Sequence, residues 1–168
     1  MPRPLVIFVR LVDRLNYGVG RFAMYLLFVL MAILLWSSVS KLAFNPSLWT
    51  LEMAQFTMVA YYILGGPYSM QMGSHVRMDL FYARFSDRKR AWWDAVTVLA
   101  LIFYLGVMLW GAVDSTAYAF AYNERSPTAW RPYMWPIKVI MCVGFVLMIL
   151  QALAALIRDV ATLRGKVI

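Results

Sequence analysis

The stretch VIMCVGFVLMILQALAALI, residues 139–157, is a run of 19 uncharged residues between Lys138 and Arg158. A transmembrane helix needs about 20 mostly apolar residues to cross roughly 30 Å of hydrocarbon. Uncharged runs of similar length lie at residues 22–40, 53–74 and 95–113. The chain is therefore expected to be a single all-α membrane domain, residues 1–168, with four transmembrane helices. We place these spans at residues 22–41, 48–72, 93–117 and 136–157.

The composition supports a membrane protein and argues against other classes. Of the 168 residues, 63% are hydrophobic and 14% charged, and the mean hydropathy is +0.68. A soluble domain would be about half apolar and about a quarter charged. The net charge of +8 lies in short stretches between the apolar runs, which does not favour a nucleic-acid-binding face. With one cysteine, Cys142, and one histidine, His75, the chain cannot form an internal disulfide or a metal or bis-histidine haem site.

The distribution of lysine and arginine predicts the orientation. Twelve of the sixteen lie in the N-terminal segment, in the segment 73–94 and in the C-terminal tail, and four lie in the other two loops. Because cytoplasmic loops are enriched in basic residues, both termini are expected in the cytoplasm. An even number of spans agrees with this orientation.

The N-terminal segment is expected to form a separate amphipathic helix over about residues 3–20. Its four arginines would fall within about 40° of one another on a helix, facing lipid phosphates, with apolar residues on the other faces. These arginines are Arg3, Arg10, Arg14 and Arg21. A cleavable signal peptide is the alternative, but no small-x-small cleavage site follows the apolar part at a suitable distance.

Two carboxylates near the predicted spans are candidates for function. Glu52 would lie about 6 Å into the second span and Asp114 about 31 Å along the third, so both belong near the outer boundary. Ion-coupling carboxylates are expected near the midplane, so pairing or partner contact is favoured over transport chemistry. Gln55 could hydrogen-bond to a neighbouring helix. The cations available on that side are Lys41, Arg125, Arg131 and Lys138.

Pro67 follows Gly65 and Gly66 late in the second predicted span. Proline removes a backbone hydrogen bond, so a kink or an early helix end is expected there. A broken helix that lines a substrate site is the alternative, but it usually needs a matching break in a second half of the molecule. No internal repeat supplies one.

The segment GSHVRMDL, residues 73–80, contains the single histidine where the second span ends. His75 and Asp79 are four residues apart and would share a helix face, while Arg77 would face lipid phosphate or a neighbouring chain. The apolar and basic residues that follow predict a short interfacial helix before the third span. A solvated loop with a locally hydrogen-bonded histidine is the alternative.

These segments together resemble one transporter family. The run Trp49-Thr50-Leu51-Glu52, then Leu64-Gly65, then His75 to Leu80, is similar to the small membrane subunit of tripartite ATP-independent periplasmic (TRAP) transporters, the DctQ-type small permease. The outer-loop run RSPTAW, residues 125–130, followed by Pro132 and Trp135, also resembles that family. The resemblance covers nearly the whole chain.

The resemblance implies a subunit that is not an enzyme and needs no cofactor, catalytic residue, substrate site or metal. It would act as a stator in a bacterial inner membrane, beside a large polytopic subunit that carries the sodium and substrate sites and moves as an elevator. A periplasmic substrate-binding protein would deliver an organic acid. The residues expected at structural contacts or at the partner interface are Trp49, Glu52, Gln55, His75, Arg77, Asp79, Asp114 and Arg125.

Two rival functions remain open. The first is a self-sufficient homodimeric exporter of the four-helix kind, which would need a carboxylate at the midplane. The second is a membrane enzyme of the quinone or thiol-oxidising kind, against which the single cysteine and single histidine argue.

Overall fold

The computed structural model describes residues 3–43, 47–73 and 87–163. They form four helices, α1 (Arg3–Ala43), α2 (Thr50–Gln71), α4 (Asp87–Ala121) and α5 (Trp135–Leu163). In these ranges β-structure is limited to one isolated bridge, between Arg125 and Tyr133. The predicted all-helical class is confirmed.

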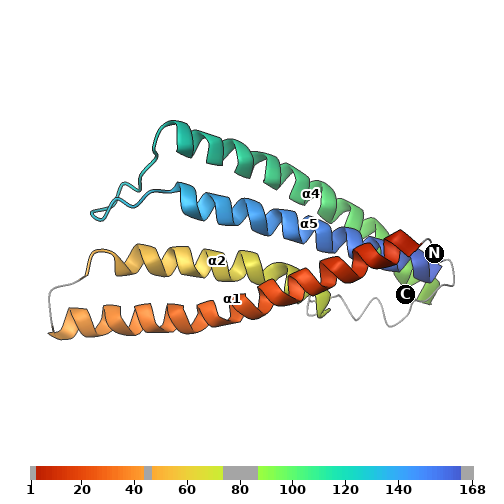
Figure 1. Cartoon of the computed structure of the whole chain (residues 1–168), viewed down its shortest axis with the longest axis horizontal. Helices are drawn as coiled ribbons and strands as arrows, with labels where there is room; N and C mark the ends of the chain where they lie inside the picture. Colours follow the sequence, from red (N-terminus) through yellow and green to blue (C-terminus); the bar gives the residue numbers. More distant parts are fainter. Residues whose placement is uncertain (1–2, 44–46, 74–86, 164–168) are drawn as a thin grey trace.

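The helices form two antiparallel pairs that lie side by side. In Figure 1 their order across the molecule is α4, α5, α2, α1, and the start of α1 lies at the same end as the end of α5. Contacts join α1 to α2, α4 to α5, α2 to α5 and, less extensively, α1 to α5. Among the described helices α4 makes its extensive contacts with α5 alone. The result is an open layer of helices with α4 at one edge.

Three of the helices are long and apolar enough to cross a membrane by length and composition. The qualifying segments are Pro4–Leu42, Val96–Ala121 and Trp135–Ala161. At 22 residues α2 is long enough, but it contains Glu52, Gln55 and several tyrosines that lower its hydropathy. Its position between α1 and α5 shields part of this polar surface, because Glu52 and Thr57 are buried.

The N-terminal segment differs from the expected arrangement of a surface helix followed by a separate span. Helix α1 is continuous over 41 residues, from Arg3 to Ala43, and has no break near residue 20. Its length is about 62 Å at 1.5 Å per residue. The first turns pack across α5, where Val9 and Val12 form a buried cluster with Ala154. This contact stabilises helical structure in the N-terminal segment, which the sequence analysis predicted to be a helix separate from the first span.

The remaining local predictions have mixed outcomes. A kink or an early helix end was expected at Pro67, and the early end is wrong because α2 continues through Pro67 to Gln71. The glycines around it allow close packing, because a Cβ at Gly66 would lie only 3.2 Å from Met148 Sδ of α5. The interfacial helix predicted after residue 79 lies outside the described residues.

Candidate functional site

The described part of the chain holds no group of three or more histidine, cysteine, aspartate or glutamate side chains that could hold a metal ion. Its polar side chains instead gather in clusters that join one helix to another. One cluster lies at the end of the layer that contains the start of α1, and the others lie at the opposite end.

The first cluster joins α1 to α5 and is called here the α1–α5 polar cluster. Asn16 Nδ2 donates to Gln151 Oε1 at 2.6 Å, and Gln151 Nε2 donates to Asp13 Oδ1 at 3.2 Å. Arg158 Nη2 donates to both oxygens of Asp13, at 2.5 and 2.6 Å. Asn16 and Gln151 are 0% and 1% exposed. These four side chains tie the N-terminal half of α1 to the last turns of α5.

The sequence analysis missed this cluster, although two signals point to it. Gln151 is the only amide in the uncharged run 139–157, and Asp13 is the only acid before residue 52. Polar residues inside an apolar membrane segment commonly hydrogen-bond to another helix. The pairing of α1 with α5 was the missing information, because these partners are more than 130 residues apart in the sequence.

Glu52 lies at the opposite end of the layer and is buried within the chain itself, at 3% exposure. Its Oε1 accepts a hydrogen bond from Ser126 Oγ at 3.5 Å, while its buried Oε2 has no partner among the described residues. A buried carboxylate with one long hydrogen bond is not paired with any of the cations expected beside it. Its burial points to packing between α2 and the α4–α5 connection.

That connection is a hairpin-like loop, and its backbone places Ser126 over Glu52. Ser126 N–H donates to the carbonyl of Pro132 at 2.9 Å, and Met134 N–H donates to the carbonyl of Glu124 at 3.0 Å. The Arg125 guanidinium lies 4.2 Å from the centroid of the Tyr133 ring and donates to its hydroxyl. The loop is thus closed by contacts across it and presents the exposed Arg125 at its surface.

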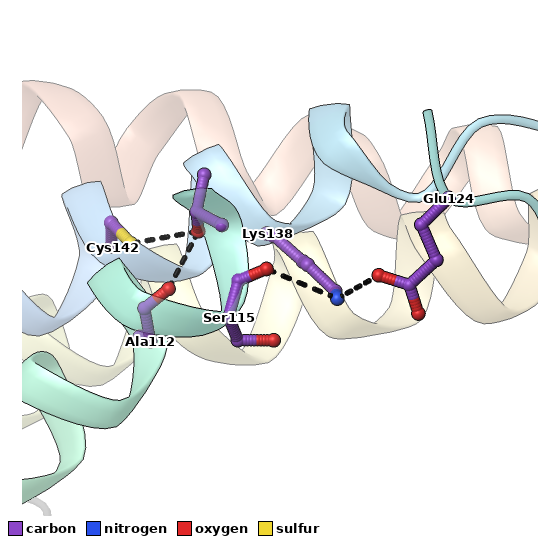
Figure 2. Close-up of polar contacts among 6 residues, drawn as sticks. Ala112, Ser115, Glu124, Lys138 and Cys142 are labelled. Atoms are coloured by element: carbon purple, nitrogen blue, oxygen red, sulfur yellow. Dashed lines mark hydrogen bonds and ion pairs between the residues drawn. The ribbon is translucent and has the colours of Figure 1, made fainter. Parts of the chain in front are cut away.

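Figure 2 shows how Lys138 fastens α5 to α4 beneath this loop. Lys138 forms an ion pair with Glu124 and donates to the carbonyl of Ser115 at 3.3 Å. One turn away, Thr116 Oγ1 donates to the carbonyl of Ala112 at 2.6 Å and lies 3.4 Å from Cys142 Sγ. The sequence analysis offered Lys138 as a partner of Glu52, but the structure pairs it with Glu124.

A cluster of hydroxyl groups joins α1 to α2 at the same end. Thr50 Oγ1 donates to the carbonyl of Ser47 at 3.1 Å and lies 3.3 Å from Ser37 Oγ. Ser40 Oγ donates to the carbonyl of Trp36 at 2.5 Å. Thr50 is almost fully buried, so these contacts satisfy polar groups where α2 begins.

Of the predicted partner-interface residues that the structure describes, Glu52 is buried and four are exposed, namely Trp49, Gln55, Asp114 and Arg125. His75, Arg77 and Asp79 lie outside the described residues. The expected lipid-phosphate contacts Arg10, Arg14 and Arg21 are exposed along α1, and Arg3 is its first residue.

Comparison with known proteins identifies the family. The model of the family "Tripartite ATP-independent periplasmic transporters, DctQ component" matches residues 30–162, which is more than half of the chain. Neither a curated protein nor a solved structure matches. The matched region contains the last 14 residues of α1, all of α2 and α4 and nearly all of α5, so it covers the clusters at the end of the layer opposite the start of α1. The chain belongs to the DctQ family, the small membrane component of TRAP transporters.

Proposed function

We propose that this chain is the stator subunit of a sodium-coupled TRAP importer in a bacterial inner membrane. It stands beside a large elevator subunit, and a periplasmic binding protein delivers an organic acid to the complex. The chain itself carries no substrate or coupling-ion site and widens the fixed scaffold against which the large subunit moves. One observation carries this proposal. The helices are joined to one another by contacts within the chain, yet large apolar side chains remain exposed on the surface of the layer.

Large apolar side chains are uncovered on α1 and on α4, the helix at one edge of the layer. Phe103 and Trp110 are 76% and 79% exposed, and they lie seven residues apart on α4. Isolated apolar residues on a surface are ordinary, but a continuous aromatic face in a membrane protein meets lipid or another chain. Asp114 is exposed one turn beyond Trp110, so this face also carries one carboxylate. We infer that part of this face receives the large subunit.

The internal contacts favour a rigid element over a moving one. The α1–α5 polar cluster joins the helices at one end, and the hydrogen bond from Lys138 to the carbonyl of Ser115 joins α5 to α4 near the other. Close glycine contacts hold α2 against α5 between these ends. A stator has to keep its shape while its partner moves, and helices joined at both ends resist sliding.

The proposed topology has four spans and both termini in the cytoplasm. Helix α2 is less apolar than the other helices. Because it runs antiparallel to α1 and lies between α1 and α5, its buried polar residues are shielded from lipid and the helix can cross the bilayer. Because the start of α1 and the end of α5 lie at one end of the layer, four crossings are compatible with the basic bias of the termini. Cysteine accessibility at either terminus would test the orientation.

Co-purification tests the stator function. The tagged full chain, expressed with the gene neighbours that encode a large polytopic protein and a secreted binding protein, should retain the large protein through detergent extraction. Uptake of organic acid into proteoliposomes should require both membrane chains. A stable monomer without a large partner would contradict the proposal, and ion-coupled transport by the chain alone would favour the homodimeric exporter.

A further inference from the structure

A groove of about 450 Å³ opens between α1 and α2. Gly20, Ala23 and Met24 of α1 form one wall, and the tyrosines and glycines of residues 61–69 form the other. Gly65 leaves part of this space empty, because a Cβ there would meet no atom within 4 Å. The volume is within the range of about 300–1,000 Å³ that is typical of small-molecule sites.

A cation lies beside the groove, toward the start of α1. The Arg21 guanidinium is 5.8 Å from the centroid of the Tyr17 ring, and the Tyr17 ring is 5.8 Å from that of Tyr68, which lines the groove. Arg21 is exposed and reaches back one turn to Tyr17, which is the usual direction of side chains on a helix. The groove, which Ser69 also lines, is therefore mostly apolar and has a basic side chain beside one mouth.

We propose that this groove is a specific site for an anionic phospholipid, with an acyl chain between α1 and α2 and the phosphate on Arg21. Charge complementarity supports the headgroup position, since a guanidinium binds phosphate oxygens through paired hydrogen bonds. Tyr17 and Tyr68 lie between cation and groove, where aromatic rings with a polar end suit the level of the headgroups. The site concerns lipid recognition by this chain alone and does not depend on the transport function.

The length of the groove suits a lipid chain. The lining residues 61–69 of α2 extend over about 12 Å. A flexible acyl chain fits a narrow apolar groove, and each methylene that it buries adds to the affinity.

Native mass spectrometry of the full chain tests the site. The purified protein is delipidated and then titrated with phosphatidylglycerol or with phosphatidylcholine of identical acyl chains. We expect one tightly retained phosphatidylglycerol and weaker retention of phosphatidylcholine. Arg21→Gln should weaken phosphatidylglycerol binding about fivefold and remove the preference over phosphatidylcholine. Gly65→Leu, which fills the groove, should weaken binding of both lipids at least about tenfold.

Two variants serve as matched controls. Gly106→Leu makes the same change on α4, where a Cβ also meets no atom within 4 Å, and should leave lipid retention unchanged. Arg14→Gln removes another exposed arginine of α1, two turns before the groove, and should also have little effect. Equal loss in Gly65→Leu and Gly106→Leu, or undiminished retention in both Arg21→Gln and Gly65→Leu, would overturn the proposal. Loss of a protein partner from Gly65→Leu with lipid retained would assign the groove to that partner and overturn it as well.

Discussion

Gly144 of α5 and Ile63 of α2 lie so close together that a Cβ on the glycine would stand 1.9 Å from Ile63 Cγ2. The carbonyl oxygen of Ile63 would be 3.2 Å from the same Cβ, so the isoleucine side chain cannot be the only group to move. Helices in membranes associate through such close approaches, because lipid offers no hydrophobic driving force between them. This contact joins the two helical pairs at the middle of the layer.

Gly144→Ala should therefore destabilise the chain by about 1–3 kcal/mol, the usual range for overpacking. The measurement is the midpoint of thermal unfolding in detergent. Gly111→Ala is the control, because a Cβ there meets no atom within 4 Å and alanine is the better helix former. Equal midpoints for the two variants would contradict the close contact.

The α1–α5 polar cluster predicts energetic coupling between Asn16 and Gln151. Asn16→Leu and Gln151→Leu should each destabilise the chain, and the double variant should lose less than their sum, by about 0.6–2 kcal/mol. The reason is that the first substitution already breaks the hydrogen bond between them. Denaturant titration of the four proteins gives this value. Asn16→Leu combined with a change of the exposed Gln55 should be additive, and coupling of equal size there would argue against the cluster.

The burial of Glu52 predicts a packing role. Glu52→Gln keeps an oxygen that can accept from Ser126, so complex assembly and uptake by the reconstituted transporter should be preserved. Glu52→Ala removes that contact and leaves a cavity, which should lower the abundance of the assembled complex. Immunoblotting of membrane fractions and uptake assays separate the two effects. Abolition of uptake by Glu52→Gln, with assembly intact, would instead assign the carboxylate to transport chemistry.

His75→Ala should lower the amount of complex without changing the KM for the transported acid. The prediction follows from the expected place of His75 at the end of the second predicted span, four residues before Asp79. Uptake is measured at several substrate concentrations and normalised to the amount of complex. A changed KM with normal assembly would show that this segment takes part in substrate selection.

The helices could be predicted from the sequence because uncharged runs of about 20 residues have few alternatives to a membrane helix. Helix α2 begins and ends within two residues of the range 48–72, whereas α5 continues six residues past residue 157. The continuity of α1 could not be predicted, since the arginines and glycines before residue 22 suggest a boundary that packing against α5 removes. The ion pair of Lys138 with Glu124 depends on the shape of the 122–134 loop, which charge counting does not describe.

The burial of Glu52 was similarly beyond the reach of sequence arguments. Its position close to the start of the second span could be estimated from helix geometry, and Glu52 is the third residue of α2. Its contact with Ser126 joins residues 74 positions apart, so it becomes visible only when the α4–α5 loop is folded over α2. The four exposed candidates needed the same information, because exposure depends on which helix faces are covered.

The unbroken α1 also has a consequence for the surrounding lipid. A continuous helix of about 62 Å is roughly twice as long as the hydrocarbon is thick, and Asp13 and Asn16 fix its crossing with the C-terminal half of α5. Its inclination is therefore set by protein contacts, and a change in bilayer thickness cannot be absorbed by tilting α1 alone. The membrane has to adapt instead, by thinning or thickening around this subunit, at a modest free-energy cost for each ångström of mismatch. A thicker or thinner host membrane should thus change the stability of the subunit more than its shape.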